Sequence, residues 1–160
     1  SMLNTNVDLQ KYLRLDSNQG LSDLGVFHNG TIDASTFSAN NGYSVVNESG
    51  QTYIAYLFAT LSGVSKVGSF TQSGATNVDC GFTGSTPALI ILKRHDSSGD
   101  WIVFDSVRGI VAGNDPSMDL NNSDAEVTNA DIVDPYSSGF ATTSSLANGN
   151  YIFYAVAGTS

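Results

Sequence analysis

Two histidines and one cysteine are the side chains of this sequence most able to act as a base or a nucleophile near neutral pH. His28 lies in the turn-like stretch "FHNGT", and His95 lies beside an expected hairpin turn. Neither belongs to a pattern that joins a nucleophile to an oriented base, and Cys80 reads as a strand residue and not as a reactive thiol. The sequence therefore predicts no enzymatic activity, no cofactor and no metal site.

Acidic side chains are concentrated in the polar region 112–135, where carboxylate oxygens could take a calcium ion or a hydroxyl-rich ligand. They belong to Asp115, Asp119, Asp124, Asp131 and Asp134. Their spacing fits no EF-hand loop, so the favoured interpretation is a solvated surface loop with one short helical turn near 124–126. Asp115, Asp119 and Asp124 are candidate surface residues for binding.

Arg94 and Trp101 are further candidates for binding, and they flank an expected hairpin turn. Two strand-like runs, 88–95 and 100–106, surround Asp96–Gly99. A four-residue type I turn with its glycine at positive φ would place Arg94 opposite Trp101, with the guanidinium over the indole ring. Exposed aromatic rings could stack on sugars, and the other candidates for such stacking are Tyr12, Tyr43 and Tyr136.

Composition and charge exclude several classes of partner. The formal net charge is −9, with six lysines and arginines against fifteen acids. Nucleic acids and anionic membrane surfaces require basic patches, which this balance does not supply. No apolar run approaches the roughly 20 residues of a membrane span, so no membrane insertion is expected. The opening residues lack the apolar segment of a signal peptide, and the single cysteine excludes an internal disulfide.

The chain has the composition of an all-β protein. Only 13% of its residues are charged, against roughly 25% in typical soluble domains, and helix-forming residues are correspondingly scarce. Strand-like runs lie at 12–16, 42–46, 52–59, 65–70, 88–95, 100–106, 139–144 and 150–157. We expect a single domain over 1–160, an antiparallel β-sandwich that is jelly-roll-like.

The strand at 88–95 is apolar on both of its faces. Leu89 and Ile91 are expected to pack inward or against a neighbouring sheet, and Ile90 and Leu92 lie on the opposite face. A strand with two apolar faces is expected to be covered on both sides.

A seven-residue pattern occurs twice: "YIAYLFA" at 53–59 and "YIFYAVA" at 151–157. Other blocks match in the same order, so that residues 12–60 repeat as 101–158, and the first copy has no counterpart of 63–100. Repetition on this scale indicates duplicated supersecondary units. The repeat predicts a sandwich built from two related halves, with Tyr53 equivalent to Tyr151 and Asp16 equivalent to Asp105.

Several separated blocks, in order along the chain, resemble a domain of tail-fibre and other virion-associated proteins of tailed bacteriophages. The blocks are Tyr53–Ala59, Gly63–Thr71, Cys80-Gly81-Phe82, Pro87–Arg94, Asp96–Trp101 and the ending that starts at Ser138-Gly139-Phe140. The resemblance covers nearly the whole chain. It implies a structural or attachment role without an enzymatic site.

The expected function is therefore that of a bacteriophage virion module, from a tail fibre or similar appendage, that serves assembly and host-surface attachment. The expected partners are further copies of the chain, such as in a trimer, other virion proteins and a host cell-surface glycan. The polar stretches 17–41 and 112–135 are the expected contact regions, with the second favoured. Two alternatives stay open: a carbohydrate-binding module of a secreted enzyme, and a capsid decoration protein.

Overall fold

The computed structural model describes residues 11–23, 36–37, 48–84 and 86–158. The chain forms two compact units where the sequence predicts one domain: residues 1–13 with 21–57, and residues 14–20 with 58–160. Each unit is described by itself. His28, Tyr43 and the expected strand 42–46 lie outside the described residues.

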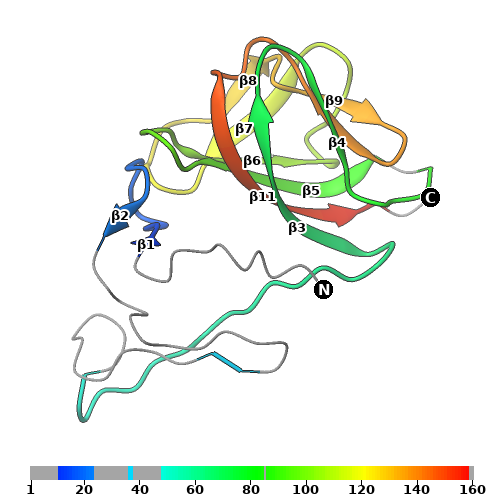
Figure 1. The fold of residues 1–160 in the computed structure, drawn as a ribbon. Coiled ribbons are helices and arrows are strands. Elements are labelled where there is room, and N and C mark those ends of the chain that lie inside the picture. The colour runs from blue at the N-terminus through cyan, green and yellow to red at the C-terminus, as the bar shows by residue number, and fades with distance from the viewer. Residues whose placement is uncertain (1–10, 24–35, 38–47, 85, 159–160) are drawn as a thin grey trace. The chain divides into compact units, whose positions relative to one another are not determined.

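The larger unit is an antiparallel β-sandwich, which confirms the predicted fold class (Figure 1). Its six-stranded sheet has the order β3 (Ser65–Gln72), β11 (Gly149–Ala157), β5 (Pro87–Arg94), β6 (Trp101–Asp105), β7 (Asp115–Asp119) and β8 (Val127–Ala130). Its three-stranded sheet has the order β4 (Thr76–Asp79), β10 (Gly139–Thr142) and β9 (Val133–Tyr136). The described residues contain no helix, and thus none that is long and apolar enough to cross a bilayer.

Aromatic rings from both sheets form the centre of the core. Phe70, Tyr151 and Phe153 come from β3 and β11 of the larger sheet, and Phe140 comes from β10 of the smaller one. The rings of Phe140 and Phe153 meet edge to face, with centroids 5.4 Å apart. Phe70 stacks on Tyr151 at 5.5 Å. The first contact joins the two sheets and the second lies within the larger one. Both are favourable, because edge-to-face and offset rings attract each other beyond their burial.

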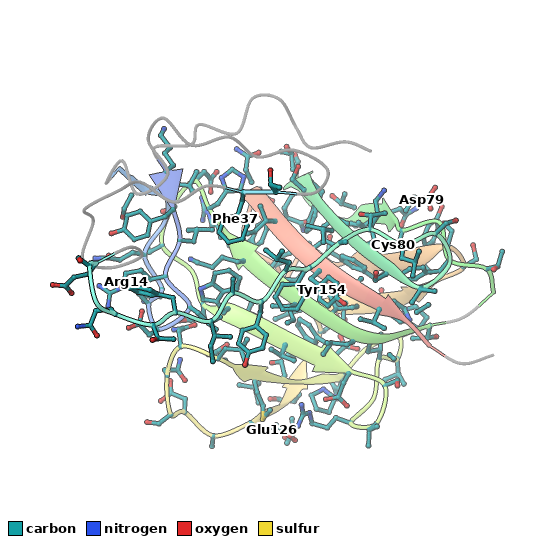
Figure 2. The ribbon with its side chains drawn as sticks, turned by 90° about the horizontal axis from the view of Figure 1, so that it is seen from below. Arg14, Phe37, Asp79, Cys80, Glu126 and Tyr154 are labelled. Carbon is teal, nitrogen blue, oxygen red and sulfur yellow. The ribbon has the colours of Figure 1, made fainter. Side chains whose placement is uncertain are left out.

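The inner face of β5 is the one that carries Ile90 and Leu92, both fully buried. Leu89 and Ile91 are half-buried on the opposite, outer face of the sheet. Of the two alternatives expected for Leu89 and Ile91, packing inward is thus wrong, while both faces of β5 are covered to some extent, as expected. On the outer face, the ring of Phe58 packs on that of Tyr154, with centroids 4.8 Å apart; Tyr154 lies near the middle of the sheet (Figure 2).

Residues 112–135 are not a loop. They contain β7, β8 and the start of β9, and no helical turn forms at 124–126. β7 and β8 lie at one edge of the larger sheet, and β7 pairs with β6 only at Asp119 and Met118. β8 is the edge strand and is mostly exposed, whereas the side chains that β7 buries, Asp115 and Ser117, are polar. Neither sequence therefore shows the apolar alternation by which a strand is recognised.

The smaller unit contains a short antiparallel pair, β1 (Lys11–Tyr12) with β2 (Ser22–Asp23). The strand predicted at 12–16 therefore ends at Tyr12. The strand predicted at 52–59 does not form: these residues are exposed and belong to no strand. Tyr151, in contrast, lies within β11. A strand forms only as part of a hydrogen-bonded ladder, and β3, which pairs along its length with β11, contacts this segment through the bond from Ser65 Oγ to the carbonyl oxygen of Ala59 at 2.8 Å. Tyr53 and Tyr151 do not occupy equivalent strand positions.

The second expected equivalence fails in the same way. Asp16 lies in an exposed turn, whereas Asp105 ends β6. At these two pairs of positions the repeats are similar in sequence but differ in structure.

Candidate binding surface

Four segments of the larger unit meet at one end of the six-stranded sheet and form what we call the hairpin-end surface. They are residues 14–20, 94–101, 119–124 and 148–150, and each is joined to another by hydrogen bonds. Figure 2 shows Arg14 at this end of the sheet and Cys80 at the far end. Four of the five residues selected from the sequence lie on this surface: Arg94, Trp101, Asp119 and Asp124.

Trp101 is half-buried and donates two hydrogen bonds within the protein. Its indole N–H donates to the carbonyl oxygen of Arg14 at 2.8 Å, and its backbone N–H donates to Asn121 Oδ1 at 2.7 Å. Asn121 in turn donates to Asp100 Oδ1 at 2.8 Å. Because its only polar atom is bonded within the protein, the indole can offer a ligand only ring surface in a fixed orientation.

Lys93 anchors the segment 14–20 to the hairpin, and its type and spacing gave no sign of this role. Its side chain is fully buried, and Nζ donates to the carbonyl oxygens of Gly99 at 2.6 Å and of Asn18 at 3.1 Å. Burial lowers the pKa of Lys93, and the negative charge of Asp100 acts in the opposite direction. A lysine at the end of a strand ordinarily reads as exposed.

The hairpin has a different register from the predicted one. Lys93, not Arg94, lies opposite Trp101. Residues directly opposite share a face, so this one-residue shift places Arg94 and Trp101 on opposite faces of the sheet. Gly99 is also not at positive φ. It is small for another reason: a Cβ there would lie 3.0 Å from the Cβ of Arg94.

Arg94 forms an ion pair instead of lying over the indole. Its Nε donates to Asp96 Oδ1 at 2.7 Å, and Asp96 Oδ2 accepts the backbone N–H of Asn150 at 3.0 Å. The hydrogen bond from Arg94 is the main cause that lowers the pKa of Asp96. Beside this pair, the backbone N–H of His95 donates to the carbonyl oxygen of Asn150 at 2.9 Å.

The three aspartates selected from region 112–135 are not one cluster. Asp119 and Asp124 lie in a turn organised by Asn122, which donates to Asp119 Oδ2 at 3.0 Å and accepts from the Asp124 N–H at 2.9 Å. Asp115 lies at the other end of β7 and is fully buried. It is therefore not a surface residue: its carboxylate accepts backbone N–H groups, and this satisfies them inside the protein.

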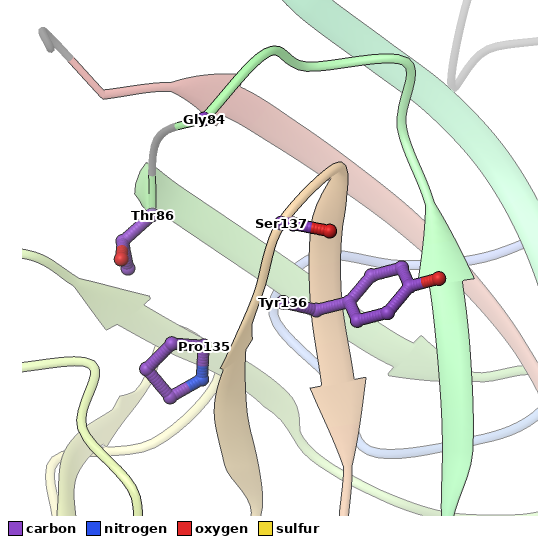
Figure 3. Close-up of a pocket in the computed structure, with 5 residues that line it drawn as sticks. All are labelled: Gly84, Thr86, Pro135, Tyr136 and Ser137. Carbon is purple, nitrogen blue, oxygen red and sulfur yellow. The ribbon is translucent and has the colours of Figure 1, made fainter.

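A small hollow lies beside the turn between β9 and β10 (Figure 3). Its volume is about 190 Å³, and Gly84, Thr86, Pro135, Tyr136 and Ser137 line it. Ligand sites for small molecules are usually larger, about 300–1,000 Å³. In Figure 3 the ring of Tyr136 points toward β4 and away from Thr86 and Pro135. The hollow is thus small, and its lining residues do not direct a set of polar groups toward one ligand position.

Cys80 follows β4 directly and is buried among core side chains. Burial is the main cause that raises the pKa of its thiol to about 11, with the charge of Asp79 acting in the same direction. Within the part of the chain that the structure describes, no group of three or more His, Cys, Asp and Glu side chains could hold a metal ion.

We expect Cys80 to react with a disulfide reagent such as DTNB at pH 8 at least about 100-fold more slowly in the native protein than in 6 M guanidinium chloride. The physical reason is that only the thiolate attacks, and both the raised pKa and burial remove it from reaction. The release of thionitrobenzoate measures the rate. Full modification within minutes without denaturant would contradict the buried, protonated thiol.

One protein family matches the chain. It is described as a domain of unknown function (DUF7483), and the match covers residues 2–159. The chain therefore belongs to this family. No curated protein and no solved structure matches it.

Proposed function

We propose that this member of the DUF7483 family is a structural module of a bacteriophage virion, in a tail fibre or a similar appendage, where it serves assembly and host-surface attachment. The observation that carries the proposal is where the phage-like sequence blocks lie in the fold. Apart from Tyr53–Ala59, which is exposed and forms no strand, they lie within the sandwich, so the resemblance concerns the domain itself and not scattered polar residues.

Three blocks illustrate this coincidence. Pro87–Arg94 is the whole of β5. Gly63–Thr71 contains a turn with Gly63 at φ 71° and most of β3. In the block Cys80-Gly81-Phe82, the two flanking side chains are buried, and Gly81 has φ 70°, a conformation that other residues rarely adopt.

The hairpin-end surface is the best-supported attachment site on this module. Its loops are held by side-chain bonds to backbone, from Lys93, Asn121 and Asp96 among others. A surface that is already ordered loses less entropy when it binds a ligand. It offers a fixed indole ring and carboxylate and amide groups, which suit a neutral, hydroxyl-rich glycan better than an anionic partner, given the net charge of −9.

The test is binding of fluorescently labelled protein to a panel of bacterial strains and to a glycan array. Replacing all of 112–130 would remove β7, so the variant must be narrower: Asn122→Ala with Asp124→Ala, which removes exposed polar groups from the turn. We expect at least about tenfold weaker binding, equivalent to about 1.4 kcal/mol. The matched control is Asp131→Ala, which removes an exposed carboxylate outside the hairpin-end surface.

Two other results would overturn parts of the proposal. Equal binding by the double variant and the Asp131→Ala control would remove the turn from the attachment mechanism. Sedimentation equilibrium measures the mass in solution, and fibre proteins are normally symmetric oligomers. A monomer that binds polysaccharide would instead indicate a carbohydrate-binding module, and an oligomer that binds no cell or glycan would indicate a decoration protein.

A further inference from the structure

We propose that the hairpin end of the sandwich is a peptide-binding site, and that its ligand is the chain's own segment 14–20, bound as a separable peptide. The chain passes between its two units at 13/14, at 20/21 and at 57/58. Residues 14–20 belong to the larger unit, although the residues on both sides of them in the sequence belong to the smaller one. A bound segment of this kind keeps residues 1–57 attached to the sandwich even when the connection near 57/58 is cut.

Three donors of the sandwich bind main-chain oxygens of the segment. The indole N–H of Trp101 donates to the carbonyl oxygen of Arg14 at 2.8 Å. The carbonyl oxygen of Asn18 accepts two bonds, from Lys93 Nζ at 3.1 Å and from the backbone N–H of Gly99 at 2.8 Å. Main-chain bonds of this type supply affinity wherever a protein binds an extended peptide. The site therefore recognises a backbone conformation and depends little on the side chains that the segment carries.

The ammonium group of Lys93 is the strongest of these donors. Its side chain is fully buried, and Nζ also donates to the carbonyl oxygen of Gly99 at 2.6 Å, so it bridges the hairpin turn and the segment. A hydrogen bond from a charged donor is stronger than one between neutral groups. Because a buried charge is costly unless it is hydrogen-bonded, losing the segment would remove a partner that Lys93 needs, and this favours the bound state.

One position of the segment is selected by its shape. A Cβ on Gly20 would lie 2.9 Å from the carbonyl oxygen of Ser97 and 3.1 Å from that of His95. Both oxygens belong to the backbone of the hairpin turn, which cannot move aside as the end of a flexible side chain can. The site therefore selects a glycine at this position of its ligand.

The segment also carries its own local order. Arg14 donates from Nε to Asp16 Oδ1 at 3.0 Å and from Nη2 to Asp16 Oδ2 at 2.9 Å. Ser17 Oγ accepts the backbone N–H of Gln19 at 3.2 Å. These bonds lie within the segment and do not involve the sandwich. A ligand that is partly ordered beforehand loses less entropy on binding, so the segment is suited to leave and to bind again as a unit.

The experiment cuts the full chain after it has folded. A recognition sequence for a site-specific protease is inserted between Ala55 and Tyr56, where Ile54 and Tyr56 are 79% and 81% exposed. After cleavage, we expect the two fragments to sediment as a single species, because the bound segment still joins them. Separation of the fragments directly after cleavage would overturn the proposal.

Two substitutions test whether the segment is the contact that holds the fragments. Gly20→Val introduces the clash with the hairpin turn, and Lys93→Met removes the charged donor while keeping the length of the side chain. We expect each to weaken the association of the cut fragments at least about tenfold. Leu15→Ala is the matched control, since this side chain of the segment is 57% exposed, and we expect it to leave the association unchanged. Equal association of the parent, Gly20→Val and Lys93→Met would show that other contacts hold the fragments, and would overturn the proposal.

A competition measurement needs no variant of the protein and so does not depend on how the substitutions fold. A synthetic peptide of residues 11–23, added in excess to the cut protein, should release the fragment 1–55, and the same peptide with Gly20→Val should not. Release by both peptides or by neither would overturn the proposal. The fluorescence of Trp101, the single tryptophan, follows the exchange, since its indole N–H contacts the segment directly.

Discussion

Replacing Asp115 with alanine is expected to lower the free energy of unfolding of the larger unit by about 3–5 kcal/mol, since each buried donor left without an acceptor costs roughly 1–3 kcal/mol. The carboxylate accepts the backbone N–H groups of Val111 at 3.1 Å, Ile132 at 3.2 Å and Val133 at 3.0 Å. Alanine removes both acceptor oxygens, and with them all three hydrogen bonds, from a fully buried site. Urea unfolding followed by the fluorescence of Trp101, the single tryptophan, measures the change.

Asp119→Ala is the matched control, because Asp119 ends the same strand and accepts from the exposed side chain of Asn122. We expect it to cost less than about 1 kcal/mol. Equal effects of the two substitutions would show that the Asp115 carboxylate is not the acceptor on which these three N–H groups depend.

The same site makes stability depend on pH. Burial is the main cause that raises the pKa of Asp115 above 3.8, although the N–H bonds from Val133, Val111 and Ile132 act against it. As pH rises from 3.8 to the higher folded pKa, the unfolded chain releases this proton first, so the contribution of Asp115 to stability falls across that window. The difference in unfolding free energy between the native protein and Asp115→Asn should therefore decrease through that window and then become constant.

Replacing Phe140 with alanine is expected to lower the free energy of unfolding by about 3–5 kcal/mol, the usual cost of removing a buried aromatic ring. Phe140 is fully buried and is the ring that the three-stranded sheet contributes to the aromatic cluster. It meets Phe153 at 5.4 Å and Phe70 at 6.2 Å, so its loss opens a cavity between the sheets and removes both contacts.

Phe58→Ala provides the comparison for the second substitution. Phe58 is likewise an aromatic residue in contact with another ring, that of Tyr154, but its side chain is 64% exposed. We expect a loss of less than about 1 kcal/mol, because little apolar area returns to water. Thermal unfolding by calorimetry separates the two variants. A Phe140→Ala protein with an unchanged melting temperature would contradict the position of this ring at the centre of the core.

The strands that the sequence predicted well are those that bury one face or both. β3, β5, β6, β10 and β11 were expected within a few residues of their observed bounds, because alternating or continuous apolar residues record burial directly. β7 and β8 were missed. Their residues are largely polar, and both strands are held by backbone hydrogen bonds that any residue can make.

For the candidate site, the sequence predicted the location of most residues correctly but not the contacts between them. Arg94, Trp101, Asp119 and Asp124 do lie at one end of the sheet. The one-residue error in the hairpin register nevertheless separated Arg94 from Trp101, because a shift of one residue changes the face on which a side chain lies. Asp115 and Lys93 were missed as structural residues, since a charged residue reads as exposed until its hydrogen-bond partners are known.

The sequence by itself determined the all-β class, the apolar strands and the absence of a basic surface, all of which follow from local composition and side-chain periodicity. Only the tertiary structure decided which copy of the repeated heptad becomes a strand. At 151–157 it lies between β3 and β5, and at 53–59 its residues are exposed and belong to no strand. The physical reason is that a β-strand is completed by hydrogen bonds from other segments, which its own seven residues do not contain.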